Sequence, residues 1–144
     1  MNTLQTLLDF WKDDEQTAPN FSAWKTTPPR LAQTLPLPKG MPDSIRQALS
    51  SLRIASLYSH QHSAWTQVHE NKNIILSTST ASGKTLAYNL PVLAKIIEEP
   101  ESRALYLFPT KALAQDQLSN LQTLQSSIVN CKSAIYDGDT PQPQ

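Results

Sequence analysis

Apolar residues near the N-terminus recur at the spacing of a helix and then give way to a proline-rich stretch. Leu4, Leu7, Leu8 and Trp11 fall on one helical face, and polar residues follow them. Six of the eleven prolines lie between residues 19 and 42, which favours extended chain over helix or central strand. We therefore predict an N-terminal helix and Pro-rich extension over residues 1–41 and a separate domain over residues 42–144.

From residue 42 onward the apolar positions switch between the spacing of helices and that of buried strands. Helical patterns occupy residues 42–52, 60–70, 84–98 and 111–124. Short apolar runs of strand length occupy residues 73–77, 103–108 and 132–136. From residue 73 the order is strand, helix, strand, helix, strand. This order predicts an α/β fold, with a parallel sheet, right-handed crossovers and helices on its faces.

The loop after the first predicted strand carries the strongest chemical signal in the sequence. It reads Thr78-Ser-Thr-Ala-Ser-Gly-Lys-Thr85 and lies between a strand pattern and a helical pattern. Such a loop holds a polyphosphate with backbone N–H groups, a lysine and a hydroxyl, at the edge of the sheet where ligands bind. We predict that Lys84 reaches the β- and γ-phosphates of a nucleotide and that the Thr85 hydroxyl takes one position around Mg²⁺.

The loop departs from the general pattern at its first position, where Thr78 stands in place of glycine. The alternative interpretation is an ordinary helix-capping turn at Ser82 and Gly83. The strand pattern before the loop and the helical pattern after it favour phosphate binding, because the motif requires that setting.

Two flanking segments carry weaker signals. Gln61 precedes the loop, and its amide could offer a donor and an acceptor to an adenine edge, although a solvated glutamine at a helix start is the alternative. Pro109, Thr110 and Lys111 follow the second predicted strand, where a Thr-Lys pair at a helix N-terminus can bind a phosphodiester. An ordinary helix cap with a basic first turn explains that pair equally well.

Taken together, these segments resemble the superfamily 2 DExD/H-box helicases in order and spacing. Residues 57–61 resemble the adenine-sensing Q motif, residues 80–85 resemble motif I, and residues 109–113 resemble motif Ia. Over most of residues 36–141 the sequence is similar to the MrfA and YprA type of ATP-dependent DNA helicase. Motif I of the superfamily 2 helicases often lacks the first glycine, which removes the objection raised by Thr78.

The resemblance implies the N-terminal part of a RecA-like P-loop NTPase domain, in a 3′-to-5′ helicase that acts on DNA in repair or maintenance. Relatives that act on RNA share the general motifs, so an RNA substrate stays open. It implies ATP binding by Gln61, Thr80, Ala81, Ser82, Gly83, Lys84 and Thr85. Mg²⁺ would lie at Thr85, and the catalytic roles would fall to Lys84 and Thr85. Nucleic acid would be contacted by Pro109, Thr110, Lys111, Gly138 and Asp139.

A motor of this class also needs an acidic pair on a later strand and an arginine from a second domain. Neither is found in this sequence, which predicts the front of a longer motor that works with its remainder in cis or as a separate chain. Asp137 competes for the role of metal-binding acid, because it follows a predicted strand. Gly138 stands where the second acid would be, which favours a loop, and the resemblance implies that this loop, residues 137–139, lies near nucleic acid.

Composition narrows the classes of function further. Twelve basic and twelve acidic residues cancel, so a nucleic-acid site must be local. No segment approaches the roughly 20 apolar residues that a bilayer span needs, and we expect a cytoplasmic protein with no membrane partner. Two alternatives stay open: a truncated, catalytically inactive nucleotide-binding or interaction module, and another P-loop phosphotransferase.

Overall fold

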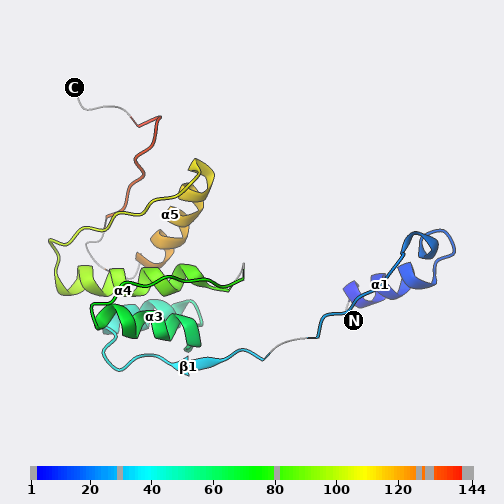
Figure 1. The fold of residues 1–144 in the computed structure, drawn as a ribbon, viewed down its shortest axis with the longest axis horizontal. Helices are drawn as coiled ribbons and strands as arrows, with labels where there is room; N and C mark the ends of the chain where they lie inside the picture. Colours follow the sequence, from blue (N-terminus) through cyan, green and yellow to red (C-terminus); the bar gives the residue numbers. More distant parts are fainter. Residues whose placement is uncertain (1–2, 29–30, 80–81, 126–127, 129–131, 141–144) are drawn as a thin grey trace. The chain divides into compact units, whose positions relative to one another are not determined.

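The computed structural model describes residues 3–28, 31–79, 82–125, 128 and 132–140 of the chain. It contains two compact units, Met1–Leu31 and Ala32–Gln144 (Figure 1). The first unit holds helix α1 (Thr3–Asp13) and a 3-10 turn, η1 (Ala18–Asn20). The predicted N-terminal helix is thus present, and none of its residues is buried.

The second unit begins with a small antiparallel sheet that the apolar pattern did not predict. Strand β1 (Thr34–Pro36) pairs with β2 (Ser56–Tyr58), and Leu35 lies opposite Leu57. Leu57 is fully buried, which anchors the sheet on the core. Part of the proline-rich segment therefore serves as an edge strand, a position that tolerates a residue without a backbone N–H.

Helix α2 (Asp43–Ser51) follows the proline-rich segment and begins where Pro42 and an acidic first turn predict a start. The Arg46 guanidinium reaches back from this helix to the preceding turn. Its Nε donates to the Met41 carbonyl at 3.1 Å, and its Nη2 donates to the Pro38 carbonyl. These contacts tie the start of α2 to the preceding turn, in which the Pro38 carbonyl also accepts the Met41 backbone N–H at 3.2 Å.

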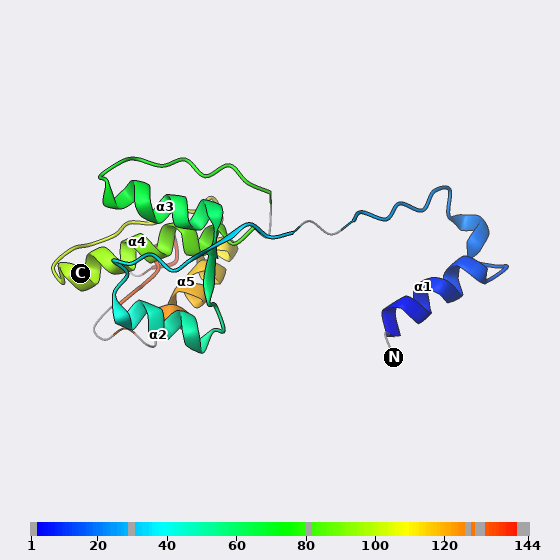
Figure 2. The same ribbon diagram turned by 90° about the horizontal axis from the view of Figure 1, so that it is seen from below.

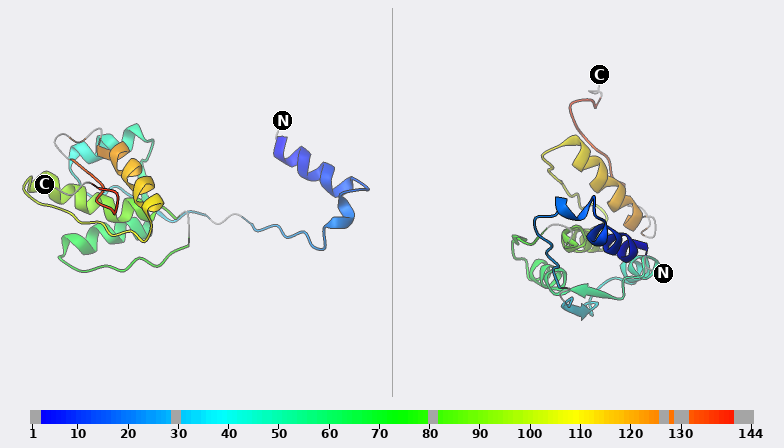
Figure 3. Two further views of the ribbon diagram at one scale, coloured as in Figure 1. Left: turned by 90° about the horizontal axis from the view of Figure 1, so that it is seen from above. Right: turned by 90° about the vertical axis from the view of Figure 1, so that its right-hand side faces the viewer.

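The three remaining predicted helices are confirmed as α3 (Ser59–His69), α4 (Lys84–Glu98) and α5 (Lys111–Gln125). Helix α3 packs along α4, and α2 contacts both α4 and α5 (Figures 2 and 3). None of the helices in the described ranges is long and apolar enough to cross a bilayer. Their buried faces meet in one core, which consists of Met41, Ile45, Leu49, Leu57, Trp65, Leu90, Leu93, Ala94, Leu124 and Ile128.

The predicted parallel sheet is wrong for the residues that the structure describes. Segments 73–77, 103–108 and 132–136 carry no strand hydrogen-bond ladder, and β1–β2 is the sheet present in the described ranges. The physical reason is pairing: an apolar run becomes a strand only beside another strand, and these three segments do not pair with one another. Apolar side chains consequently remain exposed on them, namely Ile75 at 96%, Leu105 and Leu107 at 84%, and Tyr136 at 80%.

A cavity of about 880 Å³ lies along the second and third of these segments, between them and helices α4 and α5. Leu105 and Ile135 line it from the segments, and Asn89 lines it from α4. The Asn89 side chain is buried, and its Oδ1 has no hydrogen-bond partner among the described residues. Helices α4 and α5 and the two extended segments thus border a half-open cavity.

Candidate nucleotide and nucleic-acid site

Gly83 makes the turn from the predicted phosphate loop into α4. Its φ of 77° lies in the left-handed region, which glycine adopts without the steric cost that a Cβ brings. Helix α4 begins at the next residue, so its positive N-terminal end faces the loop. The local geometry therefore resembles a loop-to-helix anion site. Thr80 and Ala81, which we predicted to bind phosphate, lie outside the described residues.

The Lys84 ammonium lies within the loop, surrounded by oxygen atoms. It donates to the carbonyls of Thr78 at 2.9 Å and Ser79 at 2.6 Å. It also lies 3.2 Å from Thr78 Oγ1 and 3.4 Å from Ser82 Oγ, and these two hydroxyls are 2.6 Å apart. Thr78, at the position where the general pattern has glycine, thus contributes two of the oxygens that hold the lysine. Phosphate oxygens are chemically suited to replace them, since both are acceptors for an ammonium.

Gln61 connects the predicted adenine segment to the phosphate loop. Its side chain is 3% exposed, its Nε2 donates to the Gly83 carbonyl at 2.8 Å, and its Oε1 accepts the Tyr58 backbone N–H at 2.8 Å. The second contact is the return half of a capping box at the start of α3. One N–H and one lone pair of the amide are left by these bonds, which is the donor and acceptor pair that an adenine edge needs.

The approach of Gln61 also explains why residue 83 has no side chain. A Cβ at that position would lie 2.6 Å from Gln61 Nε2 and 3.6 Å from Tyr58 Cδ2. The first distance is too short for non-bonded atoms. Two separate features, the positive φ and the close approach, therefore require glycine there.

Thr85, the predicted Mg²⁺ ligand, lies in the first turn of α4 and is half-buried. Its Oγ1 donates to Gln117 Oε1 at 3.3 Å, and the Tyr88 hydroxyl donates to the same oxygen at 2.5 Å. Gln117 comes from α5, 32 residues further along the chain. The sequence interpretation missed Gln117 and Tyr88, although their polar side chains at mid-helix positions were a visible signal.

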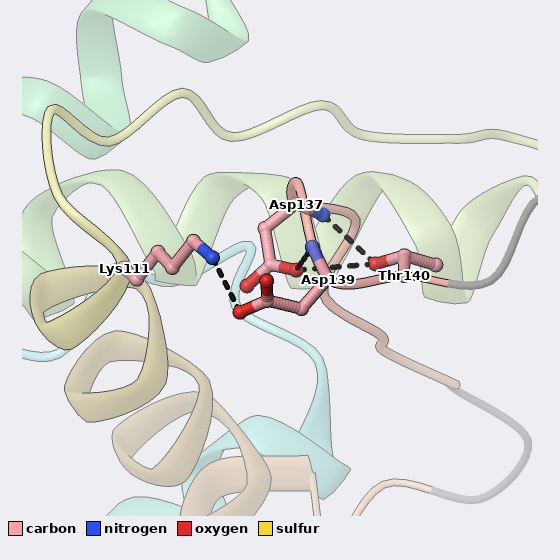
Figure 4. A network of polar contacts seen from close by, with 4 residues as sticks. All are labelled: Lys111, Asp137, Asp139 and Thr140. Carbon is pink, nitrogen blue, oxygen red and sulfur yellow. Dashed lines mark hydrogen bonds and ion pairs between the residues drawn. The ribbon is translucent and has the colours of Figure 1, made fainter.

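The start of α5 carries the residues predicted to contact nucleic acid. Thr110 caps the helix, because its Oγ1 accepts the Leu113 backbone N–H at 3.2 Å. Lys111 forms an ion pair with Asp139 (Figure 4). Its ammonium lies about 4.0 Å from where a Cβ on Gly138 would be. Pro109 lines the cavity described above. The fold therefore brings together Lys111, Gly138 and Asp139.

Asp137 organises the turn that holds Asp139 in place. Its Oδ1 accepts the Asp139 backbone N–H at 3.0 Å and the Thr140 hydroxyl at 3.3 Å, and its own backbone N–H donates to Thr140 Oγ1 at 2.9 Å (Figure 4). Its carboxylate is thus engaged within the turn. The structure describes no group of three or more His, Cys, Asp or Glu side chains placed to hold a metal ion in the ranges that it covers.

The Lys111–Asp139 pair is open to solvent, with 53% of the lysine side chain and 81% of the aspartate side chain exposed. Exposed pairs contribute at most about 1 kcal/mol, and salt screens them. A phosphodiester can therefore compete with the Asp139 carboxylate for the ammonium at little cost.

The family model of the DEAD/DEAH box helicase matches residues 58–144, a span that includes the phosphate loop and α5. The chain belongs to the DEAD/DEAH box helicase family. This membership confirms the resemblance found in the sequence, and it confirms the fold prediction in its coarser form, as part of a RecA-like helicase domain.

Two curated members of the family have sequences similar to this chain. It is 49% identical over 122 residues to the ATP-dependent helicase YprA of Bacillus subtilis (strain 168), covering 84% of this chain and 16% of that protein. It is 35% identical over 143 residues to the ATP-dependent helicase HRQ1 of Saccharomyces cerevisiae (strain ATCC 204508 / S288c), covering 97% of this chain and 13% of that protein. The chain thus spans a small part of the length of these relatives.

Two solved structures of the DUF1998 helicase MrfA are similar to this chain along nearly its whole length. The structure of MrfA bound to DNA is 45% identical and superposes with a TM-score of 0.82, covering 98% of this chain and 20% of the other. The structure of MrfA bound to DNA and AMPPNP is 46% identical and has a TM-score of 0.83. The match covers 95% of this chain and 19% of the other. These values confirm the MrfA and YprA type as the subgroup that the chain resembles.

Proposed function

We propose that this chain is the ATP-binding portion of an ATP-dependent DNA helicase. The observation that carries the proposal is the position of the Lys84 ammonium, held among the Thr78, Ser79 and Ser82 oxygens at the N-terminus of α4. The family and the DNA-bound and AMPPNP-bound state of the similar MrfA structures support it.

In this proposal each residue of the nucleotide site has a separate task. Lys84 exchanges the loop carbonyls for β- and γ-phosphate oxygens, and the N-terminus of α4 adds backbone N–H groups to the same anion. Gln61 offers its remaining N–H and lone pair to the adenine edge while it holds the Gly83 carbonyl. The Thr85 hydroxyl, near the loop and half-buried, suits a place around Mg²⁺, which when bound neutralises phosphate charge.

The nucleic-acid side of the proposal rests on the start of α5. Thr110, Lys111 and the turn at Gly138 and Asp139 form a small polar surface in which one ammonium is the positive group. A DNA backbone phosphate would bind Lys111 in place of Asp139, and base identity would not matter to such a contact. A chain whose net charge is zero is thus able to bind DNA locally, and the same contact would recognise RNA phosphates.

Substitution of Lys84 tests the proposal in the full-length protein. We expect Lys84→Ala to abolish ATP hydrolysis while DNA binding, measured by fluorescence anisotropy, stays within about twofold of the wild type. Lys95→Ala is the matched control, because Lys95 lies on the same helix but is exposed and paired with Glu99 at 2.6 Å. Hydrolysis retained by the Lys84 variant would refute the proposal.

A second candidate is a nucleotide-binding interaction module without catalysis. The exposed Leu105, Leu107 and Tyr136 favour it, because apolar side chains in that number on one part of a surface are typical of an interface. Nucleotide binding that depends on Lys84, without hydrolysis in the presence of DNA, would identify this second function.

A further inference from the structure

Gln117 contacts the first turns of α4, beside the predicted phosphate loop, and the proposed function assigns it no task. Gln117 lies in α5, seven positions after the residue that caps that helix, yet its Oε1 receives hydrogen bonds from two residues of α4. The first donor is Thr85, which the proposed function places at Mg²⁺. We propose that Gln117 is a positioning residue that orients the Thr85 hydroxyl toward the metal ion.

A hydroxyl has two lone pairs and one proton, and only a lone pair can face Mg²⁺. The proton must then point elsewhere, to an acceptor. Gln117 Oε1, at 3.3 Å from Thr85 Oγ1, is an acceptor in that position. A metal ligand whose own hydrogen bond is fixed in this way is held in the orientation that the metal requires.

The orientation of the Gln117 amide is set from its other end. Its Nε2 donates to Asp116 Oδ2 at 3.0 Å, and an ionised carboxylate only accepts hydrogen bonds. Because the nitrogen must face Asp116, the oxygen faces Thr85 and Tyr88. The same carboxylate oxygen also accepts Asn120 Nδ2 at 3.2 Å, one turn further along α5. The acceptor is therefore presented to the phosphate loop by a small polar network on α5.

Tyr88 completes the arrangement by donating its hydroxyl to the same oxygen at 2.5 Å. With two donors on it, Gln117 Oε1 has no further lone pair for a competing donor. Tyr88 and Gln117 are both half-buried, so these bonds are less exposed to exchange with water than the open Lys111–Asp139 pair. The network thus links the Mg²⁺ side of the nucleotide site to the helix whose first residue is Lys111.

Because this role rests on the proposed function, the test separates metal-dependent from metal-independent nucleotide binding. In the full-length protein we would measure binding of a fluorescent ATP analogue across a Mg²⁺ titration and again in excess EDTA. Gln117→Leu removes the acceptor at nearly constant volume. Gln115→Leu, at an exposed position of the same helix, is the matched control. Circular dichroism melts of both variants establish that they fold.

We expect Gln117→Leu to raise the Mg²⁺ concentration for half-maximal binding by about tenfold, the lower end of the range for residues behind a metal ligand. Binding in EDTA and the response of Gln115→Leu should match the wild type. Gln117→Glu keeps an acceptor but loses the N–H that Asp116 accepts, so it should restore the Mg²⁺ response only in part. In a Thr85→Val background, Gln117→Leu should have no further effect.

Equal Mg²⁺ dependence in Gln117→Leu and Gln115→Leu would overturn the role of Gln117. A parallel loss of binding with and without Mg²⁺ would also overturn it, because that pattern indicates a purely structural role for the helix contact. Absence of nucleotide binding by the folded wild-type protein would instead overturn the proposed function itself.

Discussion

Replacement of Gly83 by alanine tests the geometry of the phosphate loop most directly. The φ of 77° costs a residue with a Cβ roughly 1–2 kcal/mol. The new Cβ would also lie 2.6 Å from Gln61 Nε2, so the Gln61 side chain must move and release the Gly83 carbonyl. Loss of a hydrogen bond by an amide that is only 3% exposed costs about 1–3 kcal/mol. We therefore expect Gly83→Ala to lower the free energy of unfolding by about 2–5 kcal/mol.

Urea unfolding followed by circular dichroism measures this effect, and the chain supplies a matched control. Gly40 has no heavy atom within 4 Å of where a Cβ would be, and its φ is not positive, so Gly40→Ala should change stability by less than about 0.5 kcal/mol. In a Gln61→Ala background the amide that the new Cβ would approach is absent. Gly83→Ala should then lower the free energy of unfolding only by the contribution of the positive φ, roughly 1–2 kcal/mol. A difference between Gly83→Ala and Gly40→Ala of less than about 0.5 kcal/mol would refute the reasoning.

Three further predictions follow from other contacts. Asp139→Asn should raise the affinity of the full-length protein for single-stranded DNA about two- to fivefold at low salt, because Lys111 loses its exposed partner; an unchanged Kd by fluorescence anisotropy would exclude that competition. Gln61→Ala should reduce the preference for ATP over GTP in equilibrium binding, whereas an equal loss for both nucleotides would mean that Gln61 only braces the loop. Leu90→Ala should lower the free energy of unfolding by about 2–5 kcal/mol, because Leu90 is only 1% exposed. Leu52→Ala should lower it by less than about 1 kcal/mol, because Leu52 is 39% exposed. Similar urea midpoints for the two variants would contradict the assignment of Leu90 to the core.

The helices were predictable because their signals are local. Apolar residues at helical spacing placed the helix that begins after Gly83 within a residue or two of α4 (Lys84–Glu98), and the same holds for α2 (Asp43–Ser51). Each helix satisfies its backbone hydrogen bonds within its own segment, so a pattern confined to that segment is enough to predict it. The phosphate loop is predicted for a related reason, since one short stretch carries the glycine, the lysine and the hydroxyl.

Strands depended on information that the sequence of one segment does not contain. The runs 103–108 and 132–136 have the composition of buried strands, yet they form no ladder in the described structure, while Ser56–Tyr58 pairs with part of a proline-rich stretch. A strand exists only with a partner, and the partner is chosen by the tertiary fold. The strength of the apolar pattern therefore could not decide which segments pair.

The sequence by itself determined the positions of the helices and the family, and it predicts the chemistry of the loop before α4. Only the tertiary structure brought Gln117 to Thr85, Gln61 to Gly83 and Lys111 to Asp139, contacts between residues 32, 22 and 28 positions apart. Each contact requires two elements to be packed against each other first, because a side-chain hydrogen bond reaches only about 3 Å. The chemistry of a loop can thus be predicted from its own residues, whereas the orientation of each polar side chain is decided by how α3, α4 and α5 are placed in the tertiary structure.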